Sequence, residues 1–316
     1  MQVPETSYSS EGGGFLDLLQ QARHLVQGRS DIHQQVADVL ARVRKLERLT
    51  DEKLGLKLEG LEMLDVGAGQ LLLQMRYFAA RNRVVGIDRD LIVQGFDPRG
   101  YLEMARTNGA RRAAKTIGRK ALVIDSRYRR ELDHQLGADT PSRLDVRRMD
   151  ASDMSFPDAS FDFVYSFAVF QHLAAPDRVL DEMVRVLRPG GTLYFDFILF
   201  TSRTGSHDIR HLSGSDESIP LWAHLQPEHE DLVRPNAYLN GIRLPEWRQM
   251  LGQRMDGYDL VLDQPETAWL EPEARALQSR GKLVEYSLEE LLTSKVAVLW
   301  RRPPLHRASA RAASSF

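Results

Sequence analysis

The chain has 316 residues, of which 42% are hydrophobic and 27% are charged, and its formal net charge is -2 at pH 7. This size and balance are typical of a soluble globular protein with one large domain or two smaller ones. The nearly neutral charge provides no overall field that would attract nucleic acid or an anionic membrane. Cysteine is absent, which excludes disulfides and thiolate chemistry.

The N-terminus does not resemble a targeting signal. Residues 1–14 are polar and rich in glycine and serine, with no basic segment followed by an apolar core. No apolar run reaches the roughly 18–20 residues that span a bilayer. We therefore expect a cytoplasmic protein. Residues 304–316 are rich in arginine, alanine and serine, and we expect a disordered tail there.

Helical periodicity precedes the main domain. Apolar residues recur at near-helical spacing between Phe15 and Leu49, among them Val36, Leu40 and Val43. We expect residues 1–55 to form an N-terminal helical segment and residues 56–303 to form the main domain.

From Leu61 onward, short apolar runs rich in β-branched residues alternate with helical stretches. This order predicts parallel strands joined by right-handed crossovers, with helices on both faces of the sheet. We expect a doubly wound α/β fold with a seven-stranded, mainly parallel sheet. The expected strands are Glu62–Val66, Arg83–Asp88, Asp145–Met149, Phe161–Ser166, Thr192–Ile198, Tyr258–Leu262 and Lys295–Trp300.

Two glycines follow the first expected strand, where the chain turns into a helix predicted over Gln70–Ala80. Gly67 and Gly69 permit positive φ angles and a close approach of the backbone to a ligand. The helix would direct its free N–H groups into the same crevice. Leu72 occupies the third glycine position of the dinucleotide fingerprint, which disfavours a pyrophosphate and suits a cofactor without phosphates.

An acidic residue stands at the matching place on the next strand. Asp88 closes the run Val84–Ile87, 19 residues after Gly69. A carboxylate there can accept hydrogen bonds from both hydroxyls of a ribose. The alternative role for such an aspartate is a helix cap or a turn.

The third and fourth strand regions resemble class I, Rossmann-like S-adenosylmethionine-dependent methyltransferases of the type 11 kind. Met149–Val164 carries an acid at the end of a strand, followed by an apolar-Asp-x-Val pattern at Phe161–Val164. Ser166–Leu173 is similar to the loop that borders the transferred methyl in this family. Arg188–Gly191 matches the turn before the fifth strand.

This resemblance implies S-adenosylmethionine as the cofactor. Because the cofactor carries its own leaving group, the protein has to align the acceptor and exclude water. The cofactor-binding residues that the motifs imply are Asp65, Gly67, Ala68, Gly69, Asp88, Arg89, Asp150, Ala151, Ser166 and Phe167.

An oxygen acceptor would also need a general base. His172, in the loop expected to face the methyl, is the leading candidate for the base and for acceptor contact, although a packing role is the alternative. Asp196, at the end of the fifth strand, would orient the acceptor or cap a turn, and His211 and His207 are further candidates. The histidines follow no metal-ligand pattern, so we expect no metal.

Two insertions are expected to select the acceptor. The first is at about 91–142. Within it, the segment Arg99–Arg130 contains ten basic residues and two acidic ones. This segment could hold an anion or a carrier-protein surface, or it could be a solvated helical face. The second, at about 200–241, is expected to cover the acceptor, and core packing is the alternative role for its aromatic side chains. Its candidate acceptor-binding residues are Trp222, Tyr238 and Asn240.

We therefore expect a methyltransferase that acts on an oxygen or nitrogen of a polar small molecule, such as a carbohydrate or a natural-product intermediate. One alternative is a catalytically inactive binding protein on the same fold. Another is an oxidoreductase with a nucleotide cofactor. The near-neutral charge disfavours a nucleic-acid acceptor, and a homo-oligomer is compatible with the sequence.

Overall fold

The computed structural model of the chain describes residues 29–95, 97–121, 124–208, 210–211, 218–235 and 237–304. The expectations for residues 1–28 and for the tail at 305–316 therefore lie outside the described residues.

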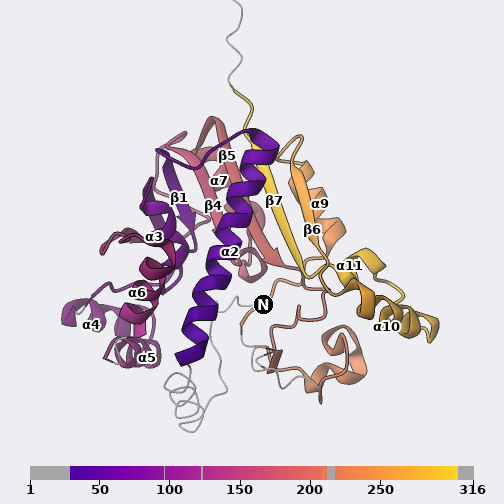
Figure 1. The fold of residues 1–316 in the computed structure, drawn as a ribbon. Helices are drawn as coiled ribbons and strands as arrows, with labels where there is room; N and C mark the ends of the chain where they lie inside the picture. Colours follow the sequence, from indigo (N-terminus) through magenta and orange to yellow (C-terminus); the bar gives the residue numbers. More distant parts are fainter. Residues whose placement is uncertain are drawn as a thin grey trace, which may run out of the picture.

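Seven strands within the described residues form one sheet, in the order β3-β2-β1-β4-β5-β7-β6 (Figure 1). From β3 to β5 the neighbouring strands pair in parallel, whereas β7 is antiparallel to both β5 and β6. This confirms the doubly wound, mainly parallel α/β fold. The strands are β1 (Glu62–Val66), β2 (Arg83–Asp88), β3 (Asp145–Arg148), β4 (Phe161–Phe167), β5 (Leu187–Ile198), β6 (Asp259–Asp263) and β7 (Lys295–Arg301).

Helices cover both faces of the sheet. On one face lie α2 (Arg29–Leu54), α3 (Leu73–Ala79) and α6 (Ile124–Leu136), and on the other lie α7 (Pro176–Val186) and α9 (Leu244–Gly252). Figure 1 shows α2 crossing the sheet on the side that faces the viewer. The other helical segments are α4 (Pro98–Thr107), α5 (Ala110–Ala121), α10 (Thr267–Ser279), α11 (Leu288–Leu292) and the 3-10 helices η1 (Phe170–His172), η3 (Ala223–Leu225) and η4 (Pro227–Leu232).

Strand β4 contributes to the hydrophobic core on both faces. Phe163 and Tyr165 pack on the α2 face, whereas Val164 packs on the α7 face, because successive side chains of a strand point in opposite directions. Helix α2 seals its face with four side chains that are at most 1% exposed. Burial of each such side chain stabilises the fold by ~1.5–3 kcal/mol. These residues are Val36, Leu40, Val43 and Leu46.

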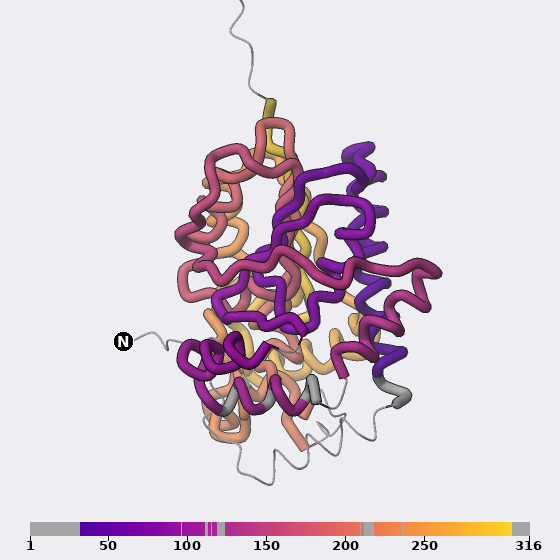
Figure 2. The backbone as a smooth tube through the Cα atoms, turned by 90° about the vertical axis from the view of Figure 1, so that its left-hand side faces the viewer, coloured from indigo at the N-terminus to yellow at the C-terminus, as the bar shows by residue number. Residues whose placement is uncertain are grey.

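Both insertions lie at the edge of the sheet where the parallel strands end. Figures 1 and 2 show α4 and α5 at that end of the molecule, and Figure 1 shows the segment that follows β5 at the same end, on the opposite side. Helix α6 packs Ile124, Tyr128 and Leu132 into the core shared with α2 and α3. Helices α4 and α5 form a small cluster of their own. Among the basic residues whose side chains are described, Arg99, Arg106, Arg127 and Arg130 are exposed.

Strand β5 begins at Leu187, five residues before the expected start at Thr192. The Arg188–Gly191 turn is incorporated into the strand, because Gly190 adopts a φ of 82° and the pairing with β4 shifts register between Phe161 and Phe163. The turn was expected before the fifth strand, whereas it lies within β5.

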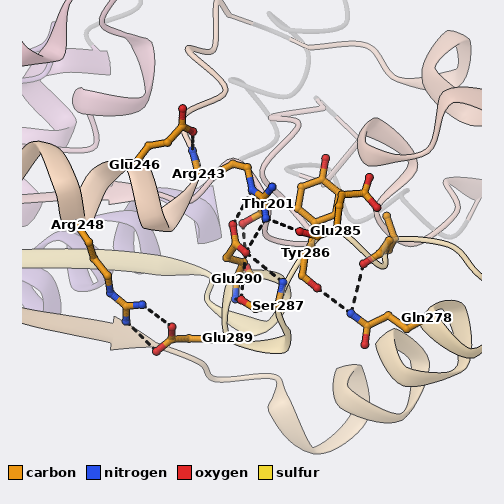
Figure 3. A network of polar contacts seen from close by, with 11 residues as sticks. Thr201, Arg243, Glu246, Arg248, Gln278, Glu285, Tyr286, Ser287, Glu289 and Glu290 are labelled. Atoms are coloured by element: carbon orange, nitrogen blue, oxygen red, sulfur yellow. Dashed lines mark hydrogen bonds and ion pairs between the residues drawn. The ribbon is translucent and has the colours of Figure 1, made fainter.

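Both ends of the second insertion are anchored to α11 through Glu290. Thr201 Oγ1 donates to the Glu290 backbone oxygen over 3.0 Å, and Arg243 Nε and Nη2 each donate to its carboxylate over 2.9 Å. The Ser287 backbone N–H donates to the same carboxylate (Figure 3). Although burial opposes ionisation, the Arg243 and Ser287 hydrogen bonds hold the pKa of Glu290 below its ordinary value. This network fixes the insertion relative to the sheet.

Replacing Arg243 with alanine is expected to destabilise the protein by about 3 kcal/mol, the lower end of the range for breaking a buried ion pair. The reason is that the Glu290 side chain is 3% exposed and would keep its charge without its main partner. Arg248→Ala is the matched control, because Arg248 and its partner Glu289 are each 43% exposed and such pairs contribute at most about 1 kcal/mol. Urea unfolding of both variants measures the difference, and equal losses would contradict this account.

Candidate functional site

The strand order reverses between β1 and β4, so the connections that leave these two strands run in opposite directions. In open α/β sheets this arrangement opens a crevice beyond the carboxyl ends of the strands, where ligands bind. The glycine turn follows β1, Asp88 ends β2, and the loop with His172 follows β4. The fold therefore brings the three main sequence motifs to one edge of the sheet.

The glycine turn is held tightly against the neighbouring strands. Gly67 and Gly69 have φ angles of 80° and 68°, a region that favours glycine. A Cβ at Gly67 would lie 2.4 Å from a methyl carbon of Val169, whereas the position beside Gly69 is open. The backbone N–H groups of Gly67 and Ala68 both donate to the Ile87 oxygen, over 2.9 and 3.0 Å. The turn therefore keeps its shape and leaves space beside Gly69.

The helix after this turn starts later than expected. Helix α3 begins at Leu73, three residues after Gln70, and it has only seven residues. Leu72, directly before the helix, has a left-handed φ of 56°. The turn therefore extends through Leu72, and the helix begins only at the next residue. The expectation that helical N–H groups begin at Gln70 and face the crevice was wrong.

Asp88 is joined directly to the glycine turn. Its Oδ2 accepts from the Gly69 N–H over 3.0 Å, and its Oδ1 accepts from the Asp90 N–H over 2.9 Å. Asp65, earlier in the same crevice, is 3% exposed, and burial raises the pKa of its carboxyl to about 8. At neutral pH this edge of the sheet therefore carries the oriented carboxyl group of Asp88 and the uncharged carboxyl group of Asp65.

The acid after β3 lies next to the end of β2. The Met149 backbone N–H donates to the Asp88 backbone oxygen over 2.9 Å. This pairing places Asp150 and Ala151 beside Asp88. The Ser152 backbone N–H and hydroxyl donate to Asp150, and these bonds, with the charge of Arg89, lower the pKa of the Asp150 carboxyl. Asp150 and Arg89 are exposed at this edge, and Ala151 packs against the core.

Ser166 lies within β4, as the predicted strand has it, and Phe167 also lies within β4 instead of in the loop after it. The Ser166 hydroxyl is fully buried and donates to the Val66 oxygen over 2.7 Å. Phe167 is 8% exposed and packs against the ring of Tyr194. Both side chains are thus used to hold the strands together, and the loop begins at Ala168.

The His172 imidazole is fixed in one orientation. Its Nδ1 lies 2.8 Å from the Tyr238 backbone oxygen, and since a carbonyl only accepts, Nδ1 carries the proton. Its Nε2 then has the lone pair, and the Gln171 side-chain amide donates to it over 3.2 Å. Burial lowers the pKa of His172. The ring is therefore neutral near pH 7, with a basic nitrogen in the loop after β4.

Asp196 lies under this loop, on the α2 face. Its Oδ1 accepts from the Ala168 N–H over 3.0 Å, and its Oδ2 is 3.8 Å from Arg42 Nε of α2. Burial raises the pKa of Asp196, although the Arg42 charge opposes this shift. Gln171 Nε2 in turn donates to the Ala168 oxygen over 3.0 Å. These contacts give Asp196 a positioning role beneath the loop that holds His172.

The end of the second insertion clamps the same loop. Asn240 Nδ2 donates to the backbone oxygens of Phe170 and Leu173, over 2.8 and 3.1 Å. The Asn240 backbone N–H donates to the Gln171 backbone oxygen over 3.0 Å. Asn240 therefore shapes the loop with its amide, and the neighbouring Tyr238 contributes its backbone oxygen to His172.

The other candidates in the insertion lie further from the glycine turn. Trp222 is 1% exposed and packs with Leu225, Leu270 and Leu291 in a separate hydrophobic cluster, so the structure favours the core-packing alternative for it. The His207 ring meets the His172 ring edge-on, with 4.9 Å between centroids. His211 is half-buried, and its backbone N–H donates to the backbone oxygen of Asp208.

Sequence reasoning missed three residues that shape the site. Arg42 carried no signal, because it lies on a helix far from β5 in the chain. Gln171 adjoins His172 in the quoted motif, so its neighbouring position was the available clue. Asp208, whose side chain is fully buried, accepts from Arg210 Nε over 2.9 Å and from the Arg234 N–H over 2.7 Å. Although burial opposes ionisation, these bonds lower the pKa of Asp208 to about 2.

The buried histidines are expected to lower stability as the pH decreases from 7 to 5.5, whereas the buried Asp65 carboxyl, whose pKa is raised to about 8, has the opposite effect in this window. Burial lowers the pKa values of His207 and His224 from 6.5 to about 4. In this window the unfolded chain binds more protons at these histidines than the folded chain does, so protonation favours unfolding. Urea midpoints at several pH values measure the stability, and the His207→Asn variant should lose less stability, or gain more, between pH 7 and 5.5 than the wild type does. A pH dependence of stability that is unchanged in this variant would contradict the assignment.

No group of three histidine, aspartate or glutamate side chains in the described part of the chain is arranged to hold a metal ion. Among the same residues, no helix combines the length and apolar character needed to cross a membrane.

The sheet order with its antiparallel β7, the glycine turn and the acid at the end of β2 are the features expected of a class I, S-adenosylmethionine-dependent methyltransferase domain. Residues 104–195 match the family model described as a methyltransferase domain. This match begins near the end of α4, extends into β5 and does not include the glycine turn. The similarity at the glycine turn therefore rests on its geometry alone.

Among curated proteins, the chain is 37% identical over 86 residues to 27-O-demethylrifamycin SV methyltransferase of Amycolatopsis mediterranei, covering 26% of this chain and 31% of that protein. It is 38% identical over 85 residues to ajmaline N-methyltransferase of Rauvolfia serpentina, covering 27% and 24%. The chain thus spans less than a third of these relatives. Phosphoethanolamine N-methyltransferase 2 of Haemonchus contortus, solved with S-adenosyl-L-methionine, has a TM-score of 0.45 and 16% identity, over 82% of this chain and 52% of that one.

Proposed function

We propose that the chain binds S-adenosylmethionine at the edge formed by β1, β2 and β4, and that it transfers the methyl group to an oxygen of a polar small molecule. The observation that carries this proposal is the fixed His172 ring, whose Nε2 lone pair lies in the loop after β4. One relative is named for a 27-O-demethyl substrate, which fits an oxygen acceptor. The relative named as an N-methyltransferase keeps nitrogen as the second possibility.

The residues at the crevice fit this cofactor. Asp88 offers carboxylate oxygens for the two ribose hydroxyls, and Asp150 and Ala151 border the adenine position beside it. The open space at Gly69 admits the part of the cofactor that passes the turn. When bound, the cofactor supplies a methyl group on a sulfonium, which is already activated for displacement.

The chain's own contribution is alignment and proton removal. The acceptor hydroxyl is held against His172, so that its oxygen faces the methyl carbon in line with the bond to sulfur. As the oxygen–carbon bond forms and the sulfur–carbon bond breaks, Nε2 takes the hydroxyl proton. The Tyr238 oxygen keeps the proton on Nδ1, so the lone pair is on Nε2, and Nε2 exchanges its hydrogen bond from Gln171 for the acceptor hydroxyl. The products are a methyl ether and adenosylhomocysteine, and His172 then releases the proton to water.

An oxidoreductase with a nucleotide cofactor fits less well. Leu72 stands at the third glycine position, is 3% exposed and has a left-handed backbone. Its side chain fills the place where a pyrophosphate-binding loop needs glycine for close approach.

Calorimetric titration of the protein with S-adenosylmethionine, S-adenosylhomocysteine and NAD tests these alternatives. We expect binding of the first two and none of NAD. Binding of NAD alone would move the oxidoreductase to the front. Binding of S-adenosylmethionine without consumption in a broad screen of hydroxyl and amine acceptors would favour the inactive binding protein.

A further inference from the structure

Two buried side-chain atoms without a hydrogen-bond partner, Gln171 Oε1 and His207 Nε2, belong to residues that contact the proposed base. Seven buried side-chain nitrogen or oxygen atoms of the described residues have no hydrogen-bond partner. Four of the seven belong to η1 and the second insertion: Gln171 Oε1, Ser202 Oγ, His207 Nε2 and Trp222 Nε1. Leaving a buried polar group unpaired costs free energy, so each such group needs an explanation, and a catalytic or binding role is one of them.

His207 is the member of this group in the second insertion whose side chain contacts His172. Its ring centroid is 4.9 Å from that of His172, and the two planes are inclined by 81°. Its backbone has a φ of 51°, which costs free energy for a residue other than glycine. Asp208 stabilises the segment that holds it, through Arg210 and the Arg234 N–H. The fold thus holds His207 in an unfavourable backbone conformation beside the base.

The charges around this pair disfavour an anionic ligand. Burial, together with the other histidines nearby, lowers the pKa of His207 to about 4, and burial lowers that of His172. Both rings are therefore neutral. The two insertion arginines nearest in sequence are already engaged, Arg203 with Glu266 and Arg210 with Asp208. A carboxylate or phosphate bound here would therefore lie against two uncharged imidazole rings. The guanidinium groups of Arg203 and Arg210 are already paired and would not neutralise it.

We propose that His207 is a second acceptor-binding residue, and that the acceptor is an uncharged molecule with two neighbouring hydroxyl groups. His172 takes the hydroxyl that reacts, and His207 Nε2 accepts a hydrogen bond from the adjacent hydroxyl. This assignment rests on the proposed methyltransferase function and adds the class of the acceptor to it.

The test uses the full chain saturated with S-adenosylhomocysteine and labelled with nitrogen-15 at histidine. Two diol probes, catechol and cis-1,2-cyclohexanediol, separate aromatic from aliphatic acceptors, and benzoate and cyclohexanecarboxylate are their anionic counterparts. We expect at least one diol to bind at least ~10-fold more tightly than its carboxylate counterpart, as expected for one hydrogen bond at a buried site. That diol should also shift the Nε2 resonance of His207.

His207→Phe keeps the ring contact but removes the nitrogen acceptor, and His134→Phe on the exposed face of α6 is its control. We expect the His207 variant to lose at least ~10-fold in diol affinity while binding S-adenosylhomocysteine as the wild type does. Should this variant fail to fold, the labelled wild-type titration decides by itself. Equal or tighter binding of the carboxylates, or no response of His207 to either diol, overturns the inference. Failure of the wild type to bind S-adenosylhomocysteine would instead overturn the proposed function.

Discussion

Replacing Asp88 with alanine is expected to weaken S-adenosylmethionine binding by ~100-fold or more, because two hydrogen bonds to a charged group contribute about 1.5–3 kcal/mol each. The carboxylate is oriented by the N–H groups of Gly69 and Asp90, so its loss also releases the glycine turn. Isothermal titration calorimetry with S-adenosylmethionine and S-adenosylhomocysteine measures both affinities.

Asp153→Ala is the matched control for this variant. Asp153 is exposed and follows the same strand edge, but its side chain makes no contact with the glycine turn in the described hydrogen bonds. We expect the affinity of this control to match that of the wild type. A comparable loss in both variants would mean that general electrostatics, and not the ribose contact, controls binding.

Replacing His172 with glutamine is expected to lower kcat by ~10²–10⁴-fold, the usual contribution of a general base. Cofactor affinity should remain unchanged, because the ring lies in the loop after β4 and not at the glycine turn. The measurement is the rate of S-adenosylhomocysteine formation with an acceptor found in the screen, together with calorimetry of the cofactor.

The pH profile separates chemistry from packing. Burial lowers the pKa of His172, so the neutral base persists below pH 6.5, and wild-type kcat/KM should fall only at a lower pH. In the glutamine variant this limb should disappear. His134→Gln serves as the surface control. If the variant lost stability and cofactor binding together with activity, His172 would be a packing residue.

The residues proposed to bind the cofactor could be selected from the sequence because their signals are local. A glycine turn and an acid are each properties of one strand end, and parallel neighbouring strands bring their carboxyl ends together. The prediction failed where the exact backbone path mattered. Phe167 was placed in a loop, but the strand continues through it, and the hydroxyl of Ser166, where the strand was expected to end, bonds to the Val66 backbone oxygen.

The acceptor half depends on contacts between distant parts of the chain. His172 could be selected from its motif, but its tautomer is set by the Tyr238 oxygen, 66 residues away. Asn240 was expected to contact the acceptor, and its amide instead binds the backbone around η1. Trp222 could have been core or site by composition, and its burial in a separate cluster favours core.

By itself, the sequence determined the α/β class, the order of strands, the glycine turn and the acid that faces it, because these follow from hydrophobic periodicity and from residues at strand ends. Only the tertiary structure decided that α2 supplies Arg42 beneath the catalytic loop, and that His207 lies beside His172. Periodicity reports which face of an element is buried, whereas it carries no information on which distant side chain will lie against that face.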